Sequence, residues 1–215
     1  MAKNKMNLIQ IGGLLLLLVV LPLGSWYYLQ TGLNYRIQAL NELKDIAPLA
    51  DFELVNYNDS LVKAERFADQ LVVGHFYTGA NKEAYFDLLQ RMEEQFDERK
   101  DVYFLTFRAG TDIATRAESA QLLLDSKVED PEQFFFLHGD AAQIAGLAKT
   151  MKLDGAVQSG SLVDNARLFF ADSAMVRSTY DMNNAEDLKL LIKHITLNLH
   201  PIEEPDIIFE RETEK

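Results

Sequence analysis

Residues 71–77 read LVVGHFY, an almost uninterrupted apolar run of strand length. Residues 82–99 follow, and in them an apolar residue recurs at every fourth position from Ala84 to Phe96. A short apolar run bounded by turn residues predicts a strand that is buried on both faces. The four-residue repeat predicts an amphipathic helix. Together they form one strand–helix unit, with its strand inside a sheet.

The sequence on both sides of this unit alternates between strand and helix patterns. Asp140 directly precedes an apolar repeat, where a side-chain oxygen can cap a helix. The polar pair Asp172-Ser173 separates two apolar runs and predicts a hairpin turn. The helix expected over residues 112–125 carries on one face Ile113, Ala117, Ala120 and Leu124. The other predicted strands are residues 52–55, 102–107, 134–137, 167–171 and 176–180, and the other predicted helices are 140–151 and 185–199.

This order of elements predicts an α/β fold. Alternating strands and helices give a mixed sheet with helices on both of its faces. The order ends in a hairpin followed by a helix, which is the ending of a thioredoxin-like domain. We therefore expect one thioredoxin-like domain.

A membrane segment is expected near the N-terminus. Residues Ile11–Leu29 form a 19-residue stretch without charge, long enough to cross a bilayer core of about 30 Å. Lys3 and Lys5 precede it, and the aromatic residues 26–28 follow it as an interfacial belt. A cleaved signal peptide is the alternative, but residues 23–26, LGSW, make a poor cleavage site. The sequence favours an uncleaved anchor with its N-terminus in the cytoplasm.

The chain is thus expected to have five parts. They are a short cytoplasmic N-terminus at residues 1–7, a transmembrane anchor at 8–29, a helical stalk at 30–47 ended by Pro48, the thioredoxin-like domain at 48–200 and an acidic tail at 201–215. All 33 acidic residues and 19 of the 21 basic ones lie beyond residue 29, so the formal charge there is −14. So acidic a surface argues against a nucleic-acid partner, which needs a cationic face.

The chain contains no cysteine. Its absence excludes disulfides, thiol redox catalysis, cysteine nucleophiles and thiolate metal sites. An enzyme of the wider thioredoxin-like group, such as a peroxidase or reductase, is therefore the least favoured function.

Three motifs, in order, carry a family resemblance: residues 76–92, FYTGANKEAYFDLLQRM; residues 136–140, FLHGD; and residues 162–168, LVDNARL. They resemble the Sco (SCO/SenC) family of membrane-anchored, thioredoxin-fold copper proteins that serve cytochrome oxidase assembly. The resemblance covers roughly residues 48–197. Aligned on Phe76 and the later Arg91-Met92 pair, the family's two cysteine positions fall on Asn81 and Tyr85, and its third copper ligand, a histidine, falls on Asn165.

All three copper ligands implied by the resemblance are therefore replaced. Copper(I) prefers thiolate or thioether sulfur, with imidazole as a partner, and carboxamides and a phenol are poor substitutes. We expect no catalytic residue, no metal site and no cofactor. The degenerate positions Asn81, Tyr85 and Asn165, with Tyr77 beside them, are instead expected to form a contact surface for another protein.

Other chemistry-bearing residues are candidates for a replacement site. His75 and His138 lie in or at the end of predicted strands and could be near each other, but hydrogen-bonded strand-end histidines are the favoured interpretation. His194 and His200 are expected at the surface and Met92 in the core, while Met175 and Met182 are candidates for weak copper binding by exposed thioethers. Ser159, Ser161 and Asp164 share a loop without a nucleophile-elbow pattern. Residues 109–112 are expected to cap a helix.

The leading prediction is a non-catalytic, single-pass protein of the bacterial inner membrane with its C-terminal domain in the periplasm. It would act through protein–protein interaction, as an accessory subunit or assembly factor of a respiratory, cytochrome oxidase-type complex. Its expected partners are integral membrane subunits of that complex. The alternative is a copper chaperone that uses non-standard histidine and methionine ligands.

Overall fold

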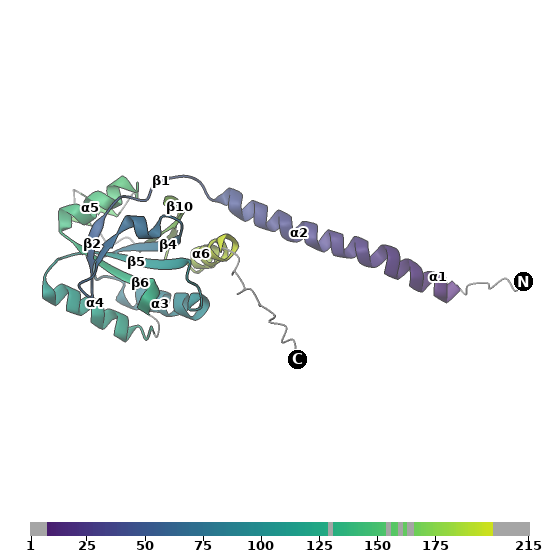
Figure 1. Cartoon of the computed structure of the whole chain (residues 1–215), viewed down its shortest axis with the longest axis horizontal. Helices are drawn as coiled ribbons and strands as arrows, with labels where there is room; N and C mark the ends of the chain where they lie inside the picture. The colour runs from purple at the N-terminus through teal and green to yellow at the C-terminus, as the bar shows by residue number, and fades with distance from the viewer. Residues whose placement is uncertain (1–7, 129–130, 154–155, 159–160, 163–165, 200–215) are drawn as a thin grey trace, which may run out of the picture. The chain divides into compact units, whose positions relative to one another are not determined.

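A computed structural model describes residues 8–128, 131–153, 156–158, 161–162 and 166–199. The chain divides into a helical unit up to Lys44 and a compact domain from Asp45 onward (Figure 1).

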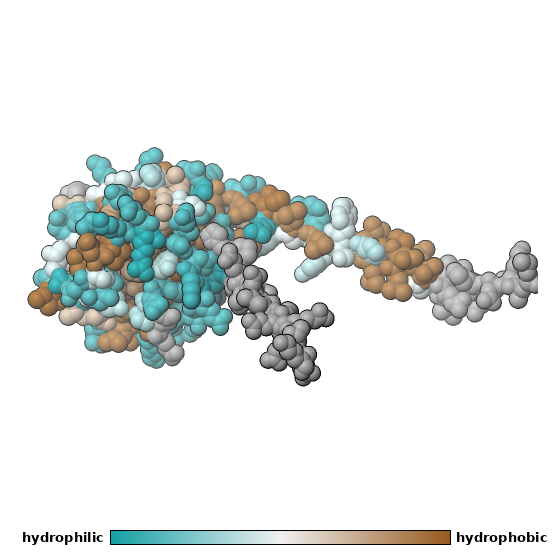
Figure 2. All heavy atoms as spheres, in the orientation of Figure 1, coloured by the Kyte–Doolittle hydropathy of each residue, from teal (hydrophilic) through white to brown (hydrophobic). Residues whose placement is uncertain are grey.

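The first unit is one long helical stretch. It consists of α1 (Leu8–Leu15), the π-helical turn η1 (Leu16–Val20) and α2 (Leu21–Glu42). The π-helical turn ends two residues before Pro22, whose ring clashes with the carbonyl four residues earlier in a regular helix. Residues Gly12–Glu42 form a helix whose mean hydropathy reaches 1.8, apolar and long enough to cross a membrane. Figure 2 shows its apolar part in brown.

The expectation of a helical stalk up to residue 47 is wrong. Helix α2 ends at Glu42, and Leu43 is extended. Ala47–Pro48 form strand β1, which pairs with the strand that contains Val176. The amides of Ile46 and Leu49 donate to backbone carbonyls of the hairpin that contains Val176, at 2.9 and 2.8 Å. Pro48 is compatible with this position because β1 is an edge strand, where one side of the backbone needs no partner.

The domain is built on an eight-stranded mixed sheet in the order β1-β10-β9-β4-β5-β6-β2-β3. Strand β4 is central, runs parallel to β5 and antiparallel to β9, and is buried along its whole length. The other strands of this sheet are β2 (Glu53–Asn56), β3 (Leu61–Lys63), β4 (Leu71–Tyr77), β5 (Val102–Ala109), β6 (Phe134–Gly139), β9 (Arg167–Asp172) and β10 (Met175–Asp181). A separate small hairpin is formed by β7 (Val157–Gln158) and β8 (Ser161–Leu162).

Helices cover both faces of this sheet (Figure 1). A buried apolar cluster joins α5 (Ala141–Thr150) to one face, where Phe76, Phe107 and Phe169 meet. On the other face, α3 (Lys82–Phe96) lies against Val73, His75 and Thr106. Helix α4 (Ile113–Asp125) reaches this second face through Ser119, which accepts from Arg108 at 3.0 Å. Helix α6 (Ala185–Asn198) packs on β10.

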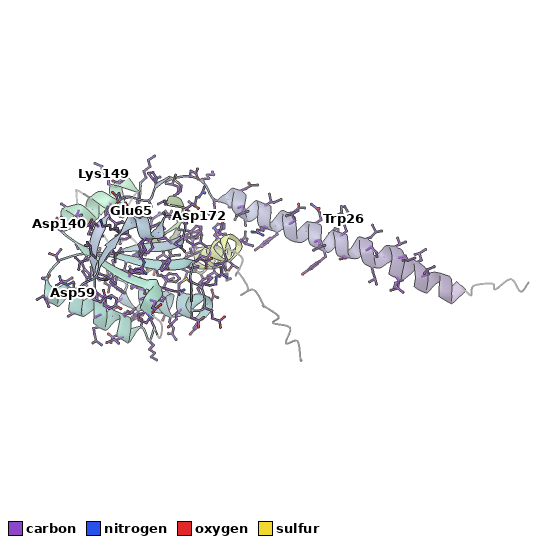
Figure 3. The ribbon with its side chains drawn as sticks, viewed as in Figure 1. Trp26, Asp59, Glu65, Asp140, Lys149 and Asp172 are labelled. Carbon is purple, nitrogen blue, oxygen red and sulfur yellow. The ribbon has the colours of Figure 1, made fainter. Side chains whose placement is uncertain are left out.

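The predicted α/β, thioredoxin-like architecture is confirmed, with local differences. Strand β4 has the predicted bounds, and Asp140, labelled in Figure 3, caps α5 by accepting from the Gln143 amide at 2.7 Å. Strand β3 was not predicted. The hairpin turn lies at Ser173-Ala174 and not at the predicted Asp172-Ser173. Ser173 and Ala174 both have positive φ, 50° and 57°, as the two central residues of a type I′ turn require.

A close contact at Gly74 fixes the centre of the sheet. A Cβ added to Gly74 would lie 2.1 Å and 2.2 Å from two ring atoms of Phe169. Phe169 stands on the neighbouring strand β9, directly opposite Gly74. Only glycine allows this aromatic ring to lie over β4, and the ring in turn joins the cluster around Phe76 and Phe107.

Candidate functional site

The junction between β4 and α3 holds the positions that the family resemblance singles out. Gly79 has φ of 97°, and Asn81, the N-cap of α3, is left-handed with φ of 56°. Asparagine tolerates this conformation better than most residues. The Asn81 side chain is exposed and makes no capping hydrogen bond, whereas its carbonyl accepts from the Tyr85 amide at 3.0 Å. Asn81 and Tyr85 therefore lie one helical turn apart.

Tyr85 points into the core. Its side chain is 2% exposed, and its ring lies 5.3 Å from the His75 ring and 5.1 Å from the Tyr77 ring, between centroids. Its hydroxyl is hydrogen-bonded to the Thr106 hydroxyl on β5. Burial raises the pKa of the Tyr85 phenol well above its ordinary value, and the bond to Thr106 offsets only part of this rise. Tyr85 is therefore a neutral core residue.

The expectation that Tyr85 and Tyr77 form a contact surface is wrong. Both rings are buried between β4, α3 and β5, where Tyr77 meets the His75 ring edge-on and Tyr85 meets it at a tilt. Asn81 is at the surface, and Asn165 lies outside the described residues. That these three positions replace the copper ligands of the family stays a prediction.

Little space is left beside Tyr85. The cavity lined by His75, Tyr85, Met92 and Thr106 has a volume of about 10 Å³. This is about the smallest volume that holds one water molecule. The phenol and the aromatic rings around it therefore fill the interior at this end of α3 and leave no room for a substrate or an organic cofactor.

The two strand histidines each bond to a backbone carbonyl. The Nδ1–H of His75 donates to the Arg167 carbonyl at 2.8 Å, and that of His138 donates to the Gly110 carbonyl at 3.0 Å. The interpretation as hydrogen-bonded histidines is confirmed. They are not neighbours, since β5 lies between their strands β4 and β6.

The remaining histidine and methionine predictions have mixed outcomes. His194 is buried, not at the surface, because it turns inward to bond the Tyr180 hydroxyl at 2.6 Å. Met92 is a core residue, as expected. Met182 is buried and Met175 half-buried, so the idea of two exposed thioethers is wrong: the hairpin packs into the domain. His200 lies outside the described residues.

Within the described ranges, no three histidine, aspartate or glutamate side chains converge to hold a metal ion. Ser161 begins strand β8, while Ser159 and Asp164 lie outside the described residues. The loop at residues 109–112 is a helix cap, as predicted: Asp112 accepts from the Thr115 amide at 2.9 Å. The Thr115 hydroxyl and amide lower the pKa of this carboxyl.

His138 makes the stability of the domain sensitive to pH. Because its Nδ1–H donates to a carbonyl, its Nε2 is the site that gains a proton, and this atom is buried without a partner among the described residues. Burial lowers the pKa of His138; Arg108 and Arg116 lower it further, while the Gly110 bond and Asp112 oppose the shift. The unfolded chain therefore binds this proton more readily than the folded domain.

We expect the free energy of unfolding to be fully retained above about pH 6.5, the ordinary histidine pKa, and to fall as the pH drops toward the lowered pKa of folded His138. Chemical denaturation at pH 7.5 and 5.5 measures this loss. His138→Asn keeps a donor for the Gly110 carbonyl but cannot titrate, so its loss should be smaller. Equal losses in the two proteins would contradict the assignment.

A larger cleft, which sequence patterns did not predict, lies elsewhere in the domain. It has a volume of about 640 Å³ and is lined by residues that precede β5 and β6 and by the turn after β2. Arg66 lies in it with its guanidinium 4.8 Å from the centre of the Phe135 ring and 5.9 Å from that of Tyr103. Its lining comes from four separate stretches of chain, so no local motif marks it.

Solved structures show what this fold resembles. A SCO1/SenC family lipoprotein from Bacillus anthracis is 16% identical over 72% of this chain and 96% of that chain, with a TM-score of 0.55. BsSco, a member of the Sco family of cytochrome c oxidase assembly proteins, is 15% identical over 72% and 96%, with a TM-score of 0.54. The domain has the Sco-type thioredoxin-like fold.

Copper-bound ScoI of Arabidopsis thaliana shares this Sco-type fold, with 15% identity, 70% and 99% coverage and a TM-score of 0.51. Other thioredoxin-fold proteins match as well, a peroxidoxin among them. A scan against protein-family models finds no match, and neither does a search of curated proteins. The comparisons establish the Sco-type fold of the domain, and its activity is a separate question.

Proposed function

We propose that this protein is a divergent, membrane-anchored member of the Sco family that acts by binding other proteins rather than by copper or thiol chemistry. Its role would be that of an accessory subunit or assembly factor of a respiratory, cytochrome oxidase-type membrane complex. The N-terminal helix would hold it in the bacterial inner membrane, with the domain on the periplasmic side.

The observation that carries this proposal is the environment of Tyr85. At a position where the family resemblance implies a copper-binding cysteine, the chain has a phenol that is buried, kept neutral and bonded to Thr106. A neutral buried phenol is a poor copper(I) ligand. With no cysteine in the chain, thiol–disulfide exchange is impossible. Without copper or thiol chemistry, the resemblance still implies a folded domain on a membrane anchor, which can act by binding other proteins.

The partner prediction is tested by extraction of native membranes in a mild detergent and capture through a C-terminal tag. We expect haem- or copper-containing respiratory subunits to be recovered in stoichiometric amounts. An equally tagged single-pass protein with an unrelated domain is the control. Recovery of the tagged chain alone would contradict a permanent-subunit role, and substoichiometric respiratory subunits would favour a transient assembly factor.

Copper binding is tested by titration of the full chain with copper(I) against a competing chelator. We expect no retention by the wild type. The copper-bound ScoI of Arabidopsis thaliana is the positive control. Retention by the wild type that is lost in His75→Ala or His138→Ala would overturn the proposal in favour of a copper chaperone.

A further inference from the structure

Helix α4 exposes an apolar stripe. Ile113 is 78% exposed and Leu124 is 71% exposed. Between them on the same face lie Ala117, exposed, and Ala120, half-buried. The opposite face of α4 carries the buried residues Ser119, Leu122 and Leu123. Figure 2 shows apolar atoms over α4 at the edge of the domain.

These side chains are not scattered surface residues. Among the described residues of the domain, just three large apolar side chains are exposed, and two of them are Ile113 and Leu124. They are eleven positions apart, about three helical turns, and so point in the same direction. Exposed apolar side chains that gather on one helix face, rather than singly over the surface, favour a contact site.

The stripe is complementary to itself. It reads large, small, small, large at positions 113, 117, 120 and 124. When two copies of α4 lie antiparallel about a two-fold axis, Ile113 of one copy meets Leu124 of the other, and Ala117 meets Ala120. A two-fold interface requires such a self-complementary patch. The alanines let the helix axes approach to about 8 Å. We propose that α4 is the self-association surface of this protein and that its occupant is the α4 of a second copy.

The charged residues around the stripe permit this contact. Arg116 is paired with Asp59, labelled in Figure 3, at 2.9 Å. Glu118 is paired with Arg108 on β5, and Asp125 is paired with Lys82 at 3.7 Å. Each of these charges already has an opposite charge within its own domain. Pairing two copies therefore leaves none of them without a counter-charge.

Two features set the strength of the contact. One helix face buries less than the roughly 1,200 Å² of a standard interface, so association is weak and depends on concentration. The part of each chain beyond residue 29 also carries a formal charge of −14, so two copies repel each other at long range. Salt screens this repulsion without weakening an apolar contact. Dimerisation should therefore become stronger as ionic strength rises.

The first test is sedimentation of the full chain in detergent over a range of protein and salt concentrations. We expect a dimer fraction that grows with both. Leu124→Asp should weaken dimerisation at least about tenfold, because it places a charge in the apolar contact. Leu61→Asp is the matched control, since Leu61 is 58% exposed on the edge strand β3, and it should behave as the wild type.

The second test uses the absence of cysteine in the native chain. Chains with Ile113→Cys and chains with Leu124→Cys are mixed in membranes and treated with a short thiol cross-linker. We expect cross-links between the two kinds of chain and few within either kind, because identical positions would be about 16 Å apart along the helices.

Three results would overturn the proposal: a monomer under all conditions, cross-links only between identical positions, or a dimer that Leu124→Asp leaves intact. The chain could instead be monomeric under all conditions, and Leu124→Asp could fail to capture a respiratory subunit that the wild type captures. The stripe would then be the binding site of that subunit. The tests do not depend on the proposed respiratory role.

Discussion

Tyr85→Ala is expected to lower the free energy of unfolding by about 3–5 kcal/mol, as truncation of a buried aromatic side chain commonly does. The ring contacts His75 and Tyr77 and lies against Phe136 at 6.4 Å between ring centroids, so alanine leaves a cavity among aromatic rings. Guanidinium denaturation, followed by the near-ultraviolet circular dichroism of the tyrosines, measures the change. The single tryptophan, Trp26, lies in α2 and does not report on the domain.

Tyr85→Phe separates the ring from its hydroxyl. It keeps the packing but leaves the buried Thr106 hydroxyl without this partner, so we expect a loss of about 1–2 kcal/mol. Equal losses in Tyr85→Ala and Tyr85→Phe would show that the hydroxyl bond, and not the ring, stabilises this region. No loss in either variant would contradict the placement of Tyr85 in the core.

Gly74→Ala is expected to lower the free energy of unfolding by about 1–3 kcal/mol, the usual cost of overpacking a core. The new methyl group would lie within 2.9 Å of three Phe169 ring atoms, and the ring cannot move freely because Phe76 and Phe107 pack against it. Thermal and chemical denaturation of the full chain measure the change.

Two variants control for the general effect of adding a methyl group. Gly146→Ala lies in α5 with no atom within 4 Å of the new Cβ, so it should stabilise the protein by about 0.5–1 kcal/mol. Phe169→Leu combined with Gly74→Ala should recover part of the stability lost by Gly74→Ala alone. A neutral Gly74→Ala would show that the two strands can separate at this point without cost.

The sequence predicted the elements whose patterns are local. Continuous apolar character placed β4 with its observed bounds, and a carboxylate before an apolar repeat placed the cap at Asp140. Strand β3 was missed because its three residues are too short for a periodic signal. The end of α2 at Glu42 depends on the pairing of β1 with β10, a contact distant in sequence.

The site was less predictable because burial is a tertiary property. The residues at positions 81 and 85 were identified from sequence, but that Tyr85 turns into the core depends on His75 and Thr106 on neighbouring strands. His194 was expected at the surface and is buried because Tyr180 lies within hydrogen-bond reach. The apolar residues on the face of α4 that carries Ile113 and Leu124 recur with the spacing of a buried helix face. This face is nevertheless exposed, because α4 packs through Ser119, Leu122 and Leu123.

The two-residue strand β1 also has a mechanical consequence. Any tension applied along the N-terminal helix would enter the domain at Ile46 and Leu49, whose amides hold β1 to the hairpin of β9 and β10. Strand β1 is the shortest strand of the large sheet and lies at its edge, so under load it detaches before the central strands. Release of residues 45–50 would add up to about 20 Å of extended chain between α2 and the domain. The burial of Leu49 and Ala50 resists this release, so the pairing of β1 would limit how far the chain between α2 and the sheet extends under load.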